Sequence, residues 1–207
     1  MFIDIHTHNN SKLEFSAIQN LNFPEAEKVF TTKDKGFFSI GFHPWHADEF
    51  SNESFLKLTN WANDKRLIAI GECGLDKYSK VSFEKQLFVF EQQIALSEKV
   101  NKPLIIHCVG YFNELFEIKK RWYPKQLWII HGFRGKPELA KQVLKAECAL
   151  SFGEHYNSES VKATPIDKLF VETDESSMFI EEIYHNLSTV KFCNAEDLDA
   201  GYRLLRL

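Results

Sequence analysis

The sequence predicts an α/β fold, a TIM-type (β/α) barrel that is incomplete or distorted near the N-terminus. Two observations carry this prediction. Short apolar runs alternate along the chain with helix-length amphipathic segments, which is typical of parallel strands joined by helical crossovers. Seven or eight such strand–helix units are present, as a (β/α)₈ barrel requires. The length of 207 residues suits one domain, which we expect to span residues 1–207.

The expected strands are apolar runs of four or five residues, a length typical of buried strands. They cover residues 2–5, 37–41, 67–71, 103–106, 127–130, 149–152 and 168–171, with a weaker candidate at 15–19. The expected helices cover residues 52–63, 83–99, 112–122, 137–146 and 178–187. Ser51 is a suitable N-cap for the first of these helices, and Pro137 fits the first turn of the fourth.

The chain is short for this fold, because a usual barrel needs about 250 residues. The deficit is visible near the N-terminus, where residues 6–14 separate the first run from the weaker candidate. A parallel crossover needs a dozen or more residues. We therefore expect that one early helix is lost or replaced by a loop.

Composition and charge exclude several classes of protein. Lys and Arg total 25 against 29 Asp and Glu, so the net charge of −4 creates no global positive field toward nucleic acid or anionic lipid. No apolar run approaches the roughly 20 residues that span a bilayer, and the N-terminus does not resemble a signal peptide. The four cysteines form no CxxC pair, so free thiols and a cytoplasmic location are expected. Nothing indicates a membrane or an obligate protein partner.

Histidine and carboxylate side chains follow six of the seven main strand candidates. They are His6 and His8, His43 and His46, Glu72, His107, His131, and Glu172 with Asp174. The carboxyl ends of parallel barrel strands share one face, so these side chains should meet there. His6 and His8 are two residues apart, so both should point the same way and chelate one ion. One zinc ion is satisfied by four ligands, and this set is large enough for two metal ions.

Six segments in order resemble the TatD family of metal-dependent hydrolases. They are DIHTH (4–8), GFHPWH (41–46), GECGLD (71–76), PLIIHC (103–108), IIHGFRG (129–135) and VETDES (171–176). GECGLD is the most specific of them, and the set runs through most of the chain. The resemblance implies a barrel of the metal-dependent hydrolase kind and a site for two divalent ions, with Zn, Mg and Mn as the candidates.

The resemblance also implies a role for each matching residue. His6 and His8 would bind one ion, Glu72 would bridge to the second, and His107 and His131 would bind that second ion. Asp174 would bind metal and hold or deprotonate the attacking water, so Asp174, Glu72 and His43 are the expected catalytic residues. His43 would contact a phosphate or protonate the leaving oxygen, or else cap a helix. His46 and Arg134 are further candidates for substrate contact.

Other residues near these segments have two interpretations each. Asp4 is expected to orient a ligand histidine, and Asp76 to fix the GECGLD loop. Trp45 either stacks on a base or is partly buried under its loop. The residues that follow His107, His131 and Asp174 depart from the usual family pattern, so the substrate contacts stay open.

Three functions follow, in decreasing order of support. The first is a metal-dependent phosphodiesterase, a deoxyribonuclease acting on DNA ends or single strands with a water activated by two metal ions. The second is hydrolysis of a carboxylic ester, an amide or an aminoacyl ester, including aminoacyl-tRNA. The third is a non-catalytic metal-binding module.

Overall fold

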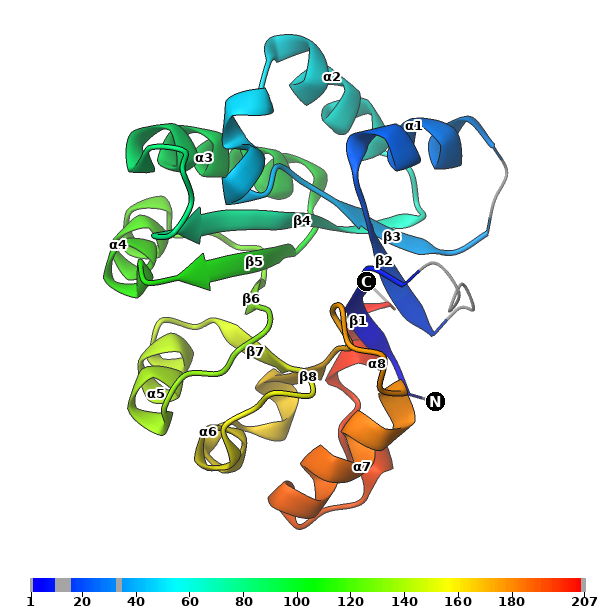
Figure 1. Cartoon of the computed structure of the whole chain (residues 1–207), viewed down its shortest axis with the longest axis vertical. Coiled ribbons are helices and arrows are strands. Elements are labelled where there is room, and N and C mark those ends of the chain that lie inside the picture. The colour runs from blue at the N-terminus through cyan, green and yellow to red at the C-terminus, as the bar shows by residue number, and fades with distance from the viewer. Residues whose placement is uncertain (1, 10–15, 33–34, 206–207) are drawn as a thin grey trace. The chain divides into compact units, whose positions relative to one another are not determined.

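The computed structural model describes residues 2–9, 16–32 and 35–205, and shows an α/β fold (Figure 1). Its eight strands follow one another in chain order, β1 to β8, in a parallel sheet. The chain divides into two compact units. Unit 1 comprises residues 1–19 and 129–207, and unit 2 comprises residues 20–128.

Unit 1 is built on the strands from the two ends of the chain. β1 (Asp4–Thr7) pairs in parallel with β2 (Ala17–Leu21), and β6 (Trp128–Ile130), β7 (Ala149–Phe152) and β8 (Leu169–Val171) pair in succession. A parallel bridge joins Thr7 to Asp174, so β1 also lies beside the end of β8. Strands in chain order whose last member returns to the first have the connectivity of a (β/α)₈ barrel.

The helices of unit 1 follow its later strands (Figure 1). They are α5 (Pro137–Lys145), α6 (Ser158–Ala163), α7 (Ile180–Lys191) and α8 (Ala200–Leu204), with short 3₁₀ helices η3 (Ile166–Lys168) and η4 (Ala195–Asp197). Both α7 and α8 pack on β8. Pro137 occupies the start of α5, where its missing N–H costs nothing.

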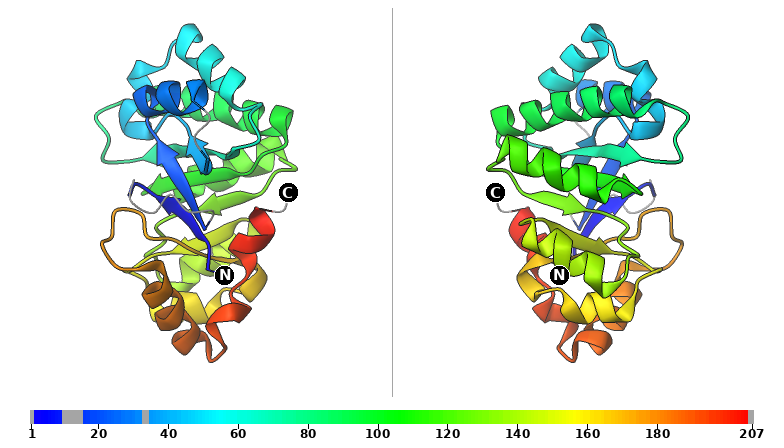
Figure 2. Two further views of the ribbon diagram at one scale, coloured as in Figure 1. Left: turned by 90° about the vertical axis from the view of Figure 1, so that its right-hand side faces the viewer. Right: turned by 90° about the vertical axis from the view of Figure 1, so that its left-hand side faces the viewer.

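Unit 2 contains β3 (Phe37–Ile40), β4 (Leu67–Asp76) and β5 (Leu104–Val109), which pair in parallel. Its helices are α1 (Phe23–Thr31), the 3₁₀ helix η2 (Pro44–Glu49), α2 (Asn52–Trp61), α3 (Phe83–Val100) and α4 (Phe112–Trp122). Figure 2 shows α3 and α4 along the outside of the strands, and α3 packs on β4. Ser51 caps α2 by accepting the N–H of Ser54, as the sequence predicts.

The predicted alternation of strands and helices is confirmed, with shifts at the element ends. β4 is twice as long as the run at 67–71 and continues to Asp76, so Glu72 lies inside a strand rather than after one. The weaker candidate at 15–19 corresponds to β2, although Phe15 lies outside the described residues. Helices α1, α6 and α8 have no counterpart in the prediction.

Two expectations about the chain as a whole have different outcomes. All eight strands of the predicted barrel are present, and the short connection lies between β1 and β2, where residues 10–15 are outside the described part. The single domain over residues 1–207 stays a prediction. Among the described residues, no helix has the length and apolar character to cross a membrane.

Candidate metal centre

In unit 1, the end of β1 places two imidazoles beside the carboxylate of Asp174. Oδ1 of Asp174 lies 3.8 Å from Nε2 of His6 and 3.7 Å from Nε2 of His8. The His6 side chain is fully buried, whereas His8 and Asp174 are 38% and 27% exposed. The donor atoms of these three residues all lie within 4.8 Å of one another. The group therefore opens to solvent on one side only.

The spacing of these donors fits a shared cation. Two donors bound about 2.1 Å from one ion at a tetrahedral angle lie about 3.4 Å apart. The observed 3.7 and 3.8 Å are too long for hydrogen bonds and close to that ligand spacing. Neutral imidazole and carboxylate are the donors that zinc, manganese and similar ions accept. His6, His8 and Asp174 are therefore suited to hold a divalent cation.

The backbone of Asp174 fixes this arrangement. Its N–H donates to the carbonyl of His6 at 2.9 Å, and its carbonyl accepts the N–H of His8 at 3.1 Å. Asp174 has a φ of 55°, in the left-handed region that Asp tolerates better than most residues. Two backbone hydrogen bonds to the strand that carries the histidines hold this conformation in place. The carboxylate and the two imidazoles are thus set by one local structure.

Asp4 links β1 to the segment after β8 by accepting hydrogen bonds from both. Its Oδ2 accepts the hydroxyl of Thr173 at 2.6 Å, and its Oδ1 accepts the N–H groups of Thr173 at 3.0 Å and His6 at 3.3 Å. Burial raises the pKa of Asp4 to about 7, although these hydrogen bonds oppose the rise. The residue acts on the backbone of His6 rather than on its ring.

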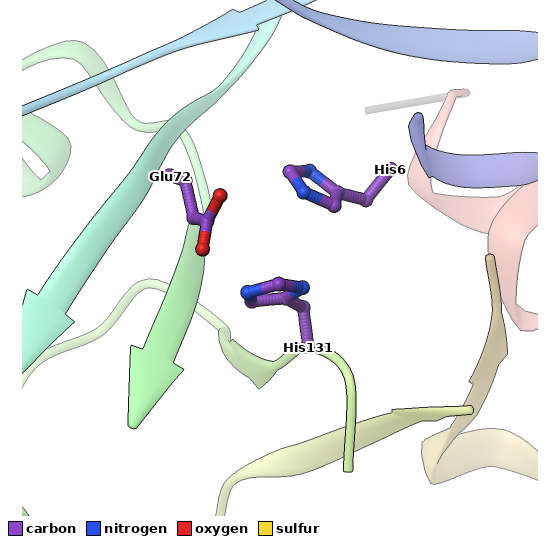
Figure 3. Close-up of side chains that lie close together, drawn as sticks. All are labelled: His6, Glu72 and His131. Atoms are coloured by element: carbon purple, nitrogen blue, oxygen red, sulfur yellow. The ribbon is translucent and has the colours of Figure 1, made fainter. Parts of the chain in front are cut away.

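His131 and Glu172 complete the polar cluster of unit 1. The His131 and His6 rings have centroids 4.5 Å apart (Figure 3). Oε1 of Glu172 accepts the N–H of Gly132 at 2.6 Å and lies 3.4 Å from Nδ1 of His131. Burial acts to raise the pKa of Glu172, but the His131 and His6 imidazoles and the Ser151 hydroxyl outweigh it, and the pKa lies below its usual value. Glu172 therefore stays ionised and positions the turn that carries His131.

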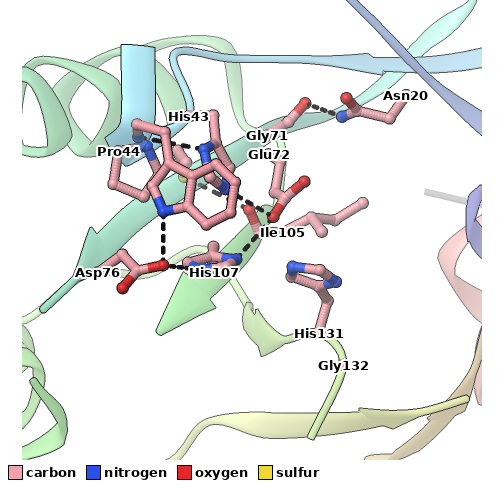
Figure 4. Close-up of polar contacts among 12 residues, drawn as sticks. Asn20, His43, Pro44, Gly71, Glu72, Asp76, Ile105, His107, His131 and Gly132 are labelled. Carbon is pink, nitrogen blue, oxygen red and sulfur yellow. Dashed lines mark hydrogen bonds and ion pairs between the residues drawn. The ribbon is translucent and has the colours of Figure 1, made fainter. Parts of the chain in front are cut away.

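In unit 2, β4 and β5 place His107 between two carboxylates. Nδ1 of His107 lies 2.9 Å from Oε1 of Glu72, and Nε2 lies 2.8 Å from Oδ2 of Asp76 (Figure 4). Gly74 lies opposite His107 in the sheet, and its φ of 134° and a close approach to the His107 carbonyl leave no room for a Cβ. A histidine held by a carboxylate on its far nitrogen is the usual arrangement of a metal ligand. His107 and Glu72 are therefore suited to share a cation.

His43 caps a helix, which is one of the two roles considered for it, and its expected role toward the substrate stays a prediction. It is the N-cap of η2, and its Nδ1 accepts the N–H of Trp45 at 3.1 Å. Because Nδ1 is the acceptor, a neutral ring carries its proton on Nε2. Nε2 lies 3.2 Å from Oε1 of Glu72 (Figure 4). The cap thus selects the tautomer whose proton faces the carboxylate.

Two buried glutamines of α3 and one asparagine of β2 position this cluster. Gln93 accepts the N–H of Phe42 at 2.7 Å and donates to the Phe42 carbonyl at 3.1 Å, directly before His43. Gln86 pairs in the same way with the backbone of Asp76, at 2.8 and 3.1 Å. Asn20 donates to the carbonyl of Gly71 at 2.8 Å, directly before Glu72 (Figure 4). Each amide fixes the backbone beside a functional side chain.

The two remaining candidates for substrate contact, Arg134 and His46, are exposed. Arg134 lines a cavity of about 420 Å³ in unit 1, and Asp174, Glu172 and Glu175 line the same cavity. His46 lies on η2 and its Nδ1 is 3.0 Å from Oε1 of Glu49. Arg134 is therefore placed beside a member of the unit 1 cluster, whereas His46 contacts a residue of its own helix.

The structure gathers His6, His8, His131 and Asp174 in unit 1, and His43, Glu72 and His107 in unit 2. Sequence reasoning gave no role to the positioning residues Asn20, Gln86 and Gln93, and it left Glu172 unassigned. Glu172 has a visible signal, because it follows β8 directly. The three amides have none, because their partners are backbone groups distant in the sequence.

Comparison with known proteins agrees with the fold and the motifs. The family model described as TatD related DNase matches residues 4–178. The "3'-5' ssDNA/RNA exonuclease TatD" of Erwinia tasmaniensis is 33% identical over 147 residues, which cover 66% of this chain and 56% of that protein. The matched region thus spans little more than half of that relative. An uncharacterized metal-dependent hydrolase of Bacillus subtilis, YabD, is 33% identical over 203 residues, covering 84% of this chain and 80% of YabD.

Solved structures show the same fold. The TatD homolog YJJV of Escherichia coli superposes with a TM-score of 0.82 at 19% identity, covering 98% of this chain and 95% of YJJV. A hydrolase of the TatD family from Entamoeba histolytica gives a TM-score of 0.76 at 20% identity. The predicted α/β barrel class is therefore confirmed. With a family model that covers most of its length, this chain belongs to the TatD-related DNase family.

Proposed function

We propose that this chain is a metal-dependent phosphodiesterase, a nuclease that hydrolyses single-stranded nucleic acid with the help of two divalent cations. The observation that carries the proposal is the group His6, His8 and Asp174, whose donor atoms have the spacing of cation ligands. The names of the relatives support the same activity, since they include a single-strand exonuclease and metal-dependent hydrolases. No observation favours acyl-ester hydrolysis over it.

We assign the cation ligands to the six residues of the motif set: His6, His8, Glu72, His107, His131 and Asp174. Divalent cations held by such donors lower the pKa of a water and neutralise charge on the attacking and leaving oxygens of a phosphodiester. The four imidazoles suit Zn, and the two carboxylates suit Mg and Mn.

The protein's own residues supply the proton transfers and part of the substrate binding. Asp174 is partly exposed at a cavity, so a water can reach its carboxylate and give up a proton to it. His43 faces the cluster through Nε2, and in its imidazolium form it can pass a proton to the leaving oxygen as the P–O bond breaks, which returns the ring to the neutral tautomer that caps η2. Arg134 lines the cavity beside Asp174 and can pair with a phosphate oxygen of the substrate.

The experiment compares Asp174→Asn with wild type on a labelled single-stranded oligonucleotide in Mg²⁺ or Mn²⁺. Asn keeps the shape and loses the charge, so we expect turnover to fall at least about 100-fold. Asp167→Asn is the matched control, since Asp167 is an exposed aspartate of unit 1 at η3, and it should keep full activity. His43→Ala should also lose turnover but retain the bound metal.

Three outcomes would overturn the proposal. Activity that survives a chelator excludes a metal-dependent reaction. Equal turnover by wild type and Asp174→Asn excludes the assigned role. Hydrolysis of an aminoacyl ester but of no phosphodiester would point to the second function considered from the sequence.

A further inference from the structure

The loops that follow β3 and β4 present two aromatic rings and two cations to solvent. Trp45 is 55% exposed and Tyr78 is 80% exposed. Lys77 and Lys80 flank Tyr78 and are exposed as well. We call these four residues the aromatic strip. All of them belong to unit 2.

The two loops form one surface because they are bonded to each other. Nε1 of Trp45 donates to Oδ2 of Asp76 at 2.7 Å, and Oγ of Ser79 donates to the carbonyl of Pro44 at 3.2 Å. Oδ1 of Asp76 accepts the N–H of Tyr78 at 2.7 Å. Asp76 thus anchors both aromatic residues, one by its indole and the other by its backbone. The rings are exposed but the loops that carry them are held in place.

The aromatic strip adjoins the polar cluster of unit 2. The Trp45 ring lies edge-on to the His43 ring with centroids 5.4 Å apart, and 6.5 Å from the His107 ring. Oδ2 of Asp76, which accepts the Trp45 N–H, is also 2.8 Å from Nε2 of His107. The Trp45 ring is thus fixed by the same carboxylate oxygen that contacts a proposed metal ligand.

This combination matches the chemistry of an unpaired nucleic-acid strand. Each base has a flat face that stacks on an aromatic ring, and each phosphate is attracted to a cation. In a duplex the base faces are already stacked inside the helix, so exposed rings gain nothing from them. Lys77, Tyr78 and Lys80 bring one ring and two positive charges together within a segment of four residues, 77–80. An apolar protein partner would leave the two lysines without a role.

We propose that the aromatic strip binds the bases and phosphates of single-stranded nucleic acid next to the phosphodiester that is cleaved. The link to cleavage rests on the proposed function, whereas the binding itself does not. Tyr78 and Trp45 stack on bases, and Lys77 and Lys80 pair with phosphates.

The test measures binding without hydrolysis, by fluorescence anisotropy in EDTA. The probes are a labelled oligothymidylate and an abasic strand of the same length. Wild type should bind the base-bearing strand about tenfold tighter, as expected for one or two stacked bases. Tyr78→Ala removes the ring but keeps the backbone N–H that Asp76 accepts, and it should reduce this preference because only Trp45 is left to stack.

Tyr123→Ala is the matched control. Tyr123 is 87% exposed in the same unit and lies outside the strip, so its loss should leave the preference unchanged. The double variant Lys77→Gln with Lys80→Gln should weaken both strands equally and reduce the slope of log affinity against log salt by about 0.7 for each lost contact.

Several results would overturn the inference: equal binding of the two strands by wild type, equal behaviour of Tyr78→Ala and Tyr123→Ala, or binding of duplex as tight as that of the single strand. The proposed function is tested separately, by measuring hydrolysis of bis(4-nitrophenyl) phosphate in Mn²⁺. If that reaction is absent but the oligonucleotide still binds, the proposed function is rejected and the inference about the aromatic strip stands.

Discussion

At the scale of single residues, two carboxylates of one segment have opposite environments. Glu172 is fully buried and Asp174 is partly exposed, although only Thr173 separates them. Both side chains line the cavity of unit 1, but β8 ends at Val171 and the left-handed backbone of Asp174 breaks the alternation of a regular strand there. Glu172 holds the turn of His131, and Asp174 faces His6 and His8. One strand end therefore supplies both a positioning residue and a proposed ligand.

Glu172→Gln is expected to weaken divalent-cation binding without unfolding the chain. Gln keeps an oxygen for the Gly132 N–H but removes the charge that faces His131. Loss of a partner of this kind costs about 10- to 100-fold in metal affinity. Isothermal titration with Mn²⁺ measures it, and Glu175→Gln is the control because Glu175 is an exposed carboxylate of the same cavity. Equal affinity of both variants and wild type would contradict the positioning role.

The sequence identifies histidines that follow apolar runs but not the residues that position them, and in the structure His6 and His107 lie inside β1 and β5. His6, His107 and His131 were found because a polar residue after a buried apolar run is conspicuous. Asn20 cannot be recognised from the sequence, because its partner is the carbonyl of Gly71, far along the chain. His43 has two interpretations in the sequence; the structure confirms the cap, and the nitrogen that faces Glu72 leaves the substrate role a prediction.

At the scale of elements, α3 buries polar as well as apolar side chains. Its apolar residues Phe90 and Ile94 are fully buried. The same face also buries Gln86 and Gln93, seven residues apart and therefore two turns apart on the helix. Each amide forms a donor–acceptor pair with the backbone of one residue, Asp76 or Phe42. A pattern of apolar residues cannot reveal such a face, because its buried members are polar.

Gln93→Leu is expected to lower the free energy of unfolding by at least about 2 kcal/mol. The change leaves the N–H and carbonyl of Phe42 buried without the partner that Gln93 provides, and each such group costs about 1–3 kcal/mol. Urea denaturation followed by circular dichroism measures the loss. Gln92→Leu makes the same chemical change at the neighbouring, half-buried position and should cost far less. Similar losses in the two variants would show that general packing of α3, rather than the Phe42 pairing, accounts for the effect.

At the scale of the whole molecule, the alternation of strands and helices was enough to predict the fold class. The alternation does not predict every helix or the end of every strand, for physical reasons. Helix α6 (Ser158–Ala163) is too short for a periodic pattern, and the polar residue Glu72 made β4 appear to end at 71 when it continues to Asp76. Helix α1 (Phe23–Thr31) begins with Phe and Pro behind its cap Asn22, a signal hidden by the uncertain strand before it.

Removal of divalent cations is expected to lower the melting temperature of the whole chain. His6 and Asp174 come from opposite ends of the region that matches the family, so an ion held by both binds the folded chain and not the unfolded one. At a free cation concentration about 100 times Kd the gain is about 2.7 kcal/mol, or about 5–11 °C for a chain of this size. Calorimetry in Mn²⁺ and in EDTA measures the shift. Asp174→Asn should reduce it and Asp167→Asn should keep it, because only the former removes a proposed ligand. A melting temperature indifferent to both cation and chelator would contradict cation binding by the folded chain.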